Sequence, residues 1–214
     1  MIKPSLVVYT LLMTSVLLTW VVQAEMLPQH AEDAHLGVAT CASSVCHGSV
    51  RPRSSASVLQ NEYVVWSRLD RHRNAYNILL SEESFWIAKN MGLENAHEAK
   101  VCLDCHADNV AYEKRGDRFQ ISDGIGCEAC HGGAERYLSN HTDPGQTHQD
   151  NIDDGMYPTD RIEDRAKLCL SCHIGDDQKM ASHEIMGAGH PRLSFELDTF
   201  GALQPAHYIL DEDY

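Results

Sequence analysis

The sequence is poor in positive charge. Its 214 residues include 17 lysines and arginines against 31 aspartates and glutamates, which gives a net charge of −14 with histidine neutral. Nucleic acids and anionic membrane surfaces attract basic patches, so this balance argues against both as partners. It fits a basic protein partner, and it equally fits a role in solubility alone.

The sequence also has little that would cross a membrane. One apolar run, from Leu6 to Val22, follows Lys3, and Val22-Gln23-Ala24 fits the small-residue pattern at which secretory signals are cut. We predict that residues 1–24 are a signal peptide and that residues 25–214 form one exported domain, periplasmic or extracellular in a bacterial-type cell. A retained N-terminal anchor is the alternative, since no other stretch is apolar enough to span a bilayer.

No cysteine stands alone. All eight fall in four close pairs, and a histidine directly follows the second member of each pair. In chain order these four segments contain Cys41, Cys46 and His47; Cys102, Cys105 and His106; Cys127, Cys130 and His131; and Cys169, Cys172 and His173. In a Cys-x-x-Cys-His segment the two thiols bond to one haem and the adjacent imidazole binds its iron. The sequence therefore predicts four covalently bound c-type haems with these four histidines as proximal ligands.

The first segment differs from the other three. CASSVCH has four residues between its thiols, whereas CLDCH, CEACH and CLSCH have two. A longer spacer still lets both sulfurs reach one haem, but a local disulfide or a share in a zinc site are alternatives for Cys41 and Cys46. Neither alternative requires a histidine directly after the second cysteine, so haem attachment is favoured in all four segments.

Hydrophobic periodicity predicts a mainly α-helical, loop-rich fold with little sheet. Apolar residues recur at helical spacing from about Val58 to Leu80, with His72 inside the stripe. Ser81 and Gly92 are expected to cap a second helix, and the chain after Arg192 is expected to be a surface tail. Four haems would supply much of the apolar surface of such a small protein, so we expect short helices packed around a stack of haems.

Two further helix starts and one long loop are predicted. Asn95 with Glu98, and Asp160 with Glu163, resemble capping boxes just before the second and fourth segments. Residues 139–159 are rich in Asp, Asn, Gly and Pro and are predicted to be a surface loop.

Whether the protein is an electron carrier or an enzyme depends on what binds each iron as its second axial ligand. Thirteen histidines less the four proximal ones leave nine, more than bis-histidine ligation of four irons needs. His72 lies in the apolar stripe, and glycines before His190 allow a close backbone approach. The predicted distal ligands are His35, His72, His141 and His190. His183 is a rival of His190, whereas surface positions are expected for His30, His97, His148 and His207.

The segments resemble the tetrahaem cytochrome c-554 family over roughly residues 35–175. The resemblance rests on GIGCEACHGG as the third segment, on SNHTD shortly after it, and on the helix that carries His72. It implies an exported, helical, loop-rich protein in which closely spaced haems pass electrons along a chain, and in which His72 and His141 look like distal ligands. The spacer of the first segment and the ending GAGHPRLSFEL depart from the family pattern.

Together these features predict an electron carrier between redox proteins rather than an enzyme. One alternative is a multihaem oxidoreductase that acts on a small nitrogen or sulfur compound at a five-coordinate iron. The resembled family includes a haem that lacks a distal protein ligand, although no Cys-x-x-Cys-Lys segment marks a catalytic haem here. Another alternative is a homo-oligomer or filament in which stacked subunits conduct electrons and a neighbour supplies a distal histidine.

Overall fold

The computed structural model of the chain describes residues 26–53 and 58–208. Its elements are η1 (Pro28–His30), α1 (Val38–Cys41), α2 (Glu62–Leu69), η2 (Arg71–Asn74), α3 (Ala75–Ile78), α4 (Glu82–Asn90), α5 (Lys100–His106), η3 (Tyr112–Lys114), η4 (Ile121–Asp123), α6 (Glu128–His131), α7 (His148–Asp153), α8 (Ile162–His173), α9 (His183–Gly187) and α10 (Leu197–Leu203). The β structure in these two ranges is limited to two isolated bridges. The predicted mainly α, loop-rich fold is confirmed.

The predicted signal peptide, residues 1–24, lies outside the described residues. Within the part of the chain that is described, no helix is long and apolar enough to cross a membrane.

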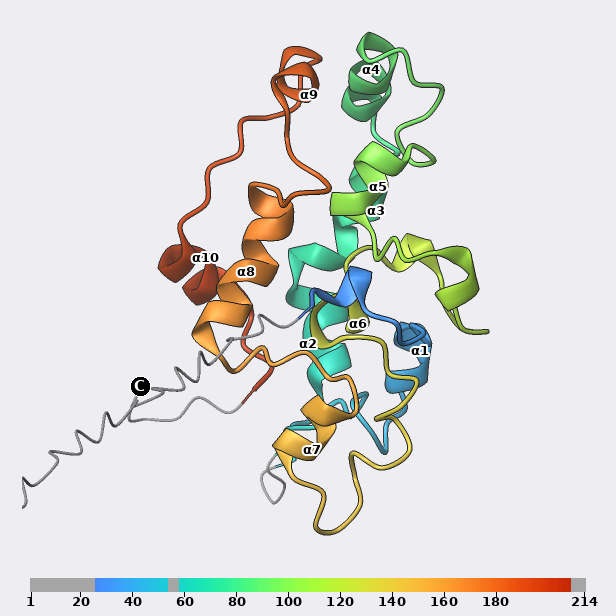
Figure 1. Cartoon of the computed structure of the whole chain (residues 1–214), viewed down its shortest axis with the longest axis vertical. Helices are drawn as coiled ribbons and strands as arrows, with labels where there is room; N and C mark the ends of the chain where they lie inside the picture. The colour runs from blue at the N-terminus through green and yellow to red at the C-terminus, as the bar shows by residue number, and fades with distance from the viewer. Residues whose placement is uncertain (1–25, 54–57, 209–214) are drawn as a thin grey trace, which may run out of the picture.

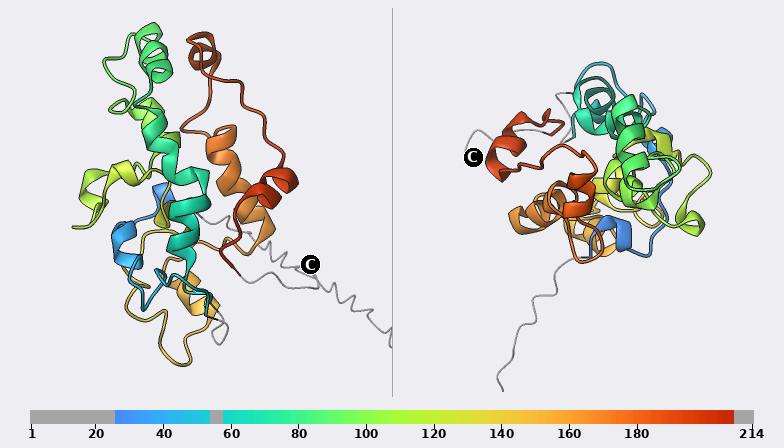
Figure 2. Two further views of the ribbon diagram at one scale, coloured as in Figure 1. Left: turned by 180° about the vertical axis from the view of Figure 1, so that it is seen from behind. Right: turned by 90° about the horizontal axis from the view of Figure 1, so that it is seen from above.

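The molecule is elongated, and its helices stand in two columns (Figure 1). α2, α3, α5 and α4 follow one another along one column, and α8 and α9 along the other, with α10 beside α8; the view from behind shows the same arrangement (Figure 2). α4 and α9 lie at one end of the long axis, and α7 lies at the other. α5 and α8 are in contact, so the second and fourth Cys/His segments, which end these helices, lie near each other.

The helix predicted from Val58 to Leu80 is broken. α2 ends at Leu69, and Asp70 takes an extended backbone conformation with its carboxylate accepting the backbone N–H of His72 at 2.9 Å. Such a local side-chain hydrogen bond competes with helix continuation. His72 consequently lies in the 3₁₀ turn η2 rather than within a continuous helix.

The second predicted helix is confirmed, but both capping boxes are wrong. Ser81 caps α4 by accepting the backbone N–H of Ser84, and Gly92 follows the helix with φ 69°. Asn95 instead donates to the side chain of Glu98, and α5 and α8 begin without a side-chain cap.

Short helices also occupy stretches that were predicted to lack them. The predicted loop over residues 139–159 contains α7, which Thr147 and Asp150 open with a capping box. The predicted tail after Arg192 contains α10. These helices have six and seven residues, too few for apolar periodicity to stand out.

The apolar core is small and lies where α3, α4 and α5 meet. Its buried cluster consists of Leu79, Ala88, Ala96, Leu103 and Ala107. Because three of these five side chains are alanines, each buries little apolar area. The cluster packs on α5 and thereby fixes the helix that carries the second segment.

Candidate haem sites

Three of the four segments each end a helix. α5 ends at His106, α6 at His131 and α8 at His173. In an α-helix the residues at positions i, i+3 and i+4 lie on one face. Each Cys-x-x-Cys-His segment therefore presents two thiols and one imidazole on the same side.

The first segment reaches a similar arrangement through a turn. α1 ends at Cys41, and the backbone N–H groups of Cys46 and Gly48 donate to the carbonyl of Ser43 at 2.9 and 2.8 Å. The N–H of His47 donates back to the carbonyl of Cys41 at 3.2 Å. This turn takes up the longer spacer, so the ends of the segment stay adjacent.

The described residues form neither the disulfide nor the zinc site that were the alternatives to haem attachment. All eight cysteines are free thiols, so Cys41 and Cys46 form no disulfide. Among the residues described, no group of three or more His, Cys, Asp or Glu side chains converges as a zinc-type ligand set.

Each proximal histidine faces one further imidazole. The ring centres of His47 and His141 lie 6.3 Å apart, and those of three other pairs lie 6.2 Å apart. These other pairs are His173 with His72, His106 with His190, and His131 with His207.

This spacing fits two imidazoles on opposite sides of one iron. An imidazole nitrogen binds a first-row transition metal at about 2.0 Å and lies about 1.1 Å from its own ring centre, so two axial rings are about 6.2 Å apart. The four pairs match that separation, and each adjoins the two thiols of one segment. The residues present therefore fit c-type haems with two axial histidines.

The other ring nitrogen is held by the protein in six of these eight histidines. Nδ1 of His47 donates to the Glu62 carboxylate, and Nδ1 of His72 donates to Asp70, both at 2.9 Å. Backbone carbonyls accept from the other four: Ala75 from His106, Leu138 from His141, Pro191 from His190, and Pro205 from His207. Because these oxygens only accept, the proton sits on Nδ1 and Nε2 keeps its lone pair for a metal.

The proximal imidazoles differ in electrostatic surroundings. Burial lowers the pKa of His106 and His173, and it lowers the pKa of His131 to about 4. The hydrogen bond to Glu62 instead raises the pKa of His47. Iron binds the neutral imidazole, which burial favours at the first three residues, whereas the carboxylate partner makes the His47 ring a more basic ligand.

The structure places three of the four predicted distal histidines opposite a proximal one: His72, His141 and His190. His35 belongs to none of the four pairs; it is fully buried, with Nδ1 2.7 Å from Oδ2 of Asp108. The fourth partner is His207, which was expected at the surface. Its segment, QPAHYIL, has no helical periodicity, so no pattern in the sequence singles it out.

The third segment is firmly tied to other parts of the chain. Its Glu128 carboxylate is buried and accepts the backbone N–H groups of Leu36, Gly37 and Ala134 at 2.7–2.9 Å. Directly after His131, a Cβ on Gly132 would lie 2.6 Å from the carbonyl oxygen of Gly155. Glycine at this position allows the close approach of the two backbones.

Thiols of different segments also meet. Cys127 of the third segment lies close enough to Cys41 of the first to lower the pKa of Cys41, and Cys172 of the fourth lies close enough to Cys105 of the second to raise the pKa of Cys105. Burial, together with nearby thiols that include Cys172, raises the pKa of Cys130 to about 12. These contacts join the segments in the order first, third, fourth, second.

Residues 40–132 match the family model described as cytochrome c554 and c-prime. Over this range the chain is similar to c554-like cytochromes. The match covers less than half of the 214 residues and includes the first three segments and His72, while the fourth segment lies beyond it. It confirms the resemblance seen in the sequence and makes this protein a c-type cytochrome with covalently bound haem iron. Neither the comparison with curated proteins nor that with solved structures found a match.

Proposed function

We propose that this c554-like cytochrome is an exported tetrahaem electron carrier in which every iron has two axial histidines. The observation that carries the proposal is the set of four imidazole pairs with ring centres 6.2–6.3 Å apart. Each pair combines the histidine of one Cys/Cys/His segment with a histidine from a distant part of the chain. The haem that each pair binds between its rings supplies one-electron chemistry.

The distal ligands then follow from the pairs. His141 serves the first segment, His190 the second, His207 the third and His72 the fourth. His35 has a structural role in this proposal, because its ring belongs to none of the four imidazole pairs. Of the nine histidines that are not proximal, these four complete the set.

The contacts between thiols support an order for the electron path. The first and third segments touch through Cys41 and Cys127, and the second and fourth through Cys105 and Cys172. Cys130 lies near Cys172 and links the two halves. A path in the order first, third, fourth, second places the first and second haems at its ends, where redox partners would exchange electrons.

An imidazole on both sides of every iron leaves no coordination position for a substrate. The task of the protein is then to hold the haems close together and to set their reduction potentials. No observation in the described residues favours the oxidoreductase or the filament, so neither is proposed.

Export and partner class belong to the same proposal. The predicted signal at residues 1–24 and the covalent haem attachment of the family support export to the periplasm or beyond it. The net charge of −14 supports a positively charged redox protein as one partner.

The test combines haem stoichiometry with spectroscopy on the purified mature protein. Mass spectrometry should find four haems attached, and electron paramagnetic resonance of the oxidised protein should show low-spin iron alone. The reduced protein should not bind carbon monoxide. Three haems or fewer, or a high-spin signal accompanied by carbon monoxide binding, would contradict the proposal.

A matched variant addresses the fourth segment, which lies outside the family match. Replacing Cys169 and Cys172 by Ser should reduce the haem count by one. An unchanged count would show that the fourth segment holds no haem.

A further inference from the structure

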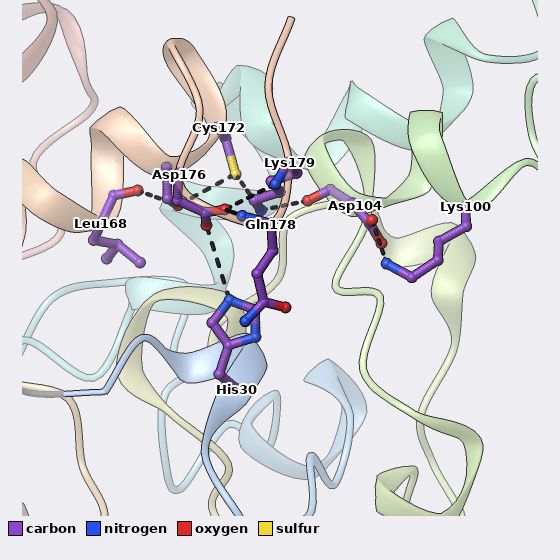
Figure 3. Close-up of polar contacts among 9 residues, drawn as sticks. His30, Lys100, Asp104, Leu168, Cys172, Asp176, Gln178 and Lys179 are labelled. Carbon is purple, nitrogen blue, oxygen red and sulfur yellow. Dashed lines mark hydrogen bonds and ion pairs between the residues drawn. The ribbon is translucent and has the colours of Figure 1, made fainter.

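The second and fourth segments share a lysine. Nζ of Lys179 donates to the backbone carbonyl of Asp104, in the second segment, at 2.5 Å, and lies 3.2 Å from Sγ of Cys172, in the fourth. Figure 3 shows the side chain of Lys179 reaching between these two residues. Because Cys172 also contacts Cys105, the ammonium lies at the place where the two segments meet.

A short turn after α8 holds this lysine in position. The Asp176 carboxylate accepts the backbone N–H groups of Gln178 and Lys179 at 2.8 and 2.9 Å, and the N–H of Asp176 donates to the carbonyl of Lys179. His30 approaches the same carboxylate from η1 at 3.8 Å. The backbone of Lys179 is therefore held through both its N–H group and its carbonyl group.

Lys179 forms no direct ion pair with a carboxylate among the described residues, and its contact with Sγ of Cys172 would carry no opposite charge once that sulfur is bonded to haem. Among the described residues, no carboxylate oxygen lies within 4.0 Å of its Nζ, whereas the neighbouring Lys100 is paired with Asp104. Lys179 is partly buried, while the side chain of Lys100 is 82% exposed. Water screens an exposed charge far more than a partly buried one.

We propose that Lys179 raises the reduction potentials of the two haems held by the second and fourth segments. This inference rests on the proposed function and extends it. Reduction lowers the net charge at an iron by one unit, so a fixed cation nearby favours the reduced form. One electron then passes from the first and third segments towards the fourth and second: one iron goes from ferrous to ferric, another goes from ferric to ferrous, and no proton is transferred.

The test is a spectroelectrochemical redox titration of the complete haem-loaded protein and three variants. Lys179→Gln removes the charge but keeps an N–H donor for the Asp104 carbonyl. It should shift the reduction equilibrium of two of the four haems about tenfold towards the oxidised form, which is 59 mV for a one-electron couple. Lys179→Arg keeps the charge and should shift no haem more than about threefold. Lys100→Gln is the matched control at an exposed, paired lysine and should also stay within about threefold.

The haem count and the low-spin signal are recorded on the same samples. Four low-spin haems whose equilibria are unchanged by Lys179→Gln would overturn the role of Lys179 and leave the electron-carrier proposal standing. Equal shifts in Lys179→Gln and Lys100→Gln, or a uniform shift of all four haems, would also overturn it. Fewer than four haems in the unmodified protein would instead count against the proposed function.

Discussion

His35 and His207, near opposite ends of the chain, lie in segments that differ in how strongly they are hydrogen-bonded to the rest of the protein. His35 belongs to an N-terminal segment, residues 33–37, that is tied to other elements at almost every position: Asp33 pairs with Arg136, and the N–H groups of Leu36 and Gly37 donate to Glu128. His207 lies in a C-terminal tail, residues 204–208, where, within the described part of the chain, its Nδ1 hydrogen-bonds only to the carbonyl of Pro205, at 3.4 Å. The well-anchored histidine faces no other imidazole, and the loosely anchored one faces His131.

A distal ligand needs more than a firm anchor in the fold. Anchoring to a carboxylate does not separate the two roles, since Asp108 holds Nδ1 of His35 and Asp70 holds Nδ1 of His72. Among the described residues, what His35 lacks is a proximal imidazole opposite its ring. A ligand needs one anchored nitrogen and a second nitrogen turned towards the metal. In the proposed function a short tail is enough for His207, since ligation would itself hold the side chain.

The largest expected effect is the loss of one axial ligand. His207→Ala should convert one of the four irons to a five-coordinate, high-spin state that binds carbon monoxide when reduced, because the described residues place no other imidazole opposite His131. Electron paramagnetic resonance and carbon monoxide difference spectra of the haem-loaded variant measure this change.

His35→Ala is the matched variant at the histidine that lies outside the four pairs. It should leave all four irons low-spin, because His35 faces none of the proximal rings. A high-spin iron in His35→Ala, together with an unchanged spectrum in His207→Ala, would show that the two histidines have exchanged the roles assigned to them here.

The proximal half of each candidate site is contiguous in the sequence, whereas the distal half is not. The thiols and the proximal imidazole are contiguous, so a pattern such as CLDCH contains the whole arrangement, and helical spacing puts its members on one face. The distal partners come from distant segments, and sequence separation says little about spatial distance. His35, six residues before Cys41, was therefore favoured over His207, which lies 34 residues after the last segment.

The helical class was predictable for a related reason, whereas the helix ends were not. Periodicity over several turns identified α2 and α4, but the hydrogen bond from the His72 N–H to Asp70 divided the first predicted helix. In such a break, a side-chain oxygen replaces a backbone carbonyl as the acceptor of an N–H group. The order of apolar and polar residues stays the same, so hydrophobic periodicity cannot predict the break.

The next expected effect concerns the anchorage of the N-terminal segment. Glu128→Ala leaves three backbone N–H groups without an acceptor: those of Gly37 and Ala134, which are buried, and that of Leu36, which is partly buried. We expect the free energy of unfolding to fall by about 3–5 kcal/mol. Chemical denaturation of the haem-loaded protein measures it.

Two controls sharpen this second test. Glu135→Ala removes one exposed hydrogen bond to the N–H of Ala34 and should cost less than about 1 kcal/mol. Truncation after Leu203 removes the C-terminal tail and should cost less than Glu128→Ala. A larger cost for the truncation would mean that the tail, and not the N-terminal segment, is the stronger anchor.

The smallest expected effect is a dependence of stability on pH that belongs to His35. Burial lowers the pKa of His35, but the hydrogen bond to Asp108, with further help from Asp108 and Glu128 as negative charges, leaves it raised above 6.5. A raised folded-state pKa contributes stability that is complete below about pH 6.5 and is lost as the pH rises through the folded-state pKa. The difference in unfolding free energy between the unmodified protein and His35→Gln should therefore be about 1–3 kcal/mol at about pH 5.5 and smaller at about pH 8.5. Titrations of the iron ligands are common to both proteins and cancel in this difference, so a difference that stays constant or grows with pH would show that His35 is held by packing alone.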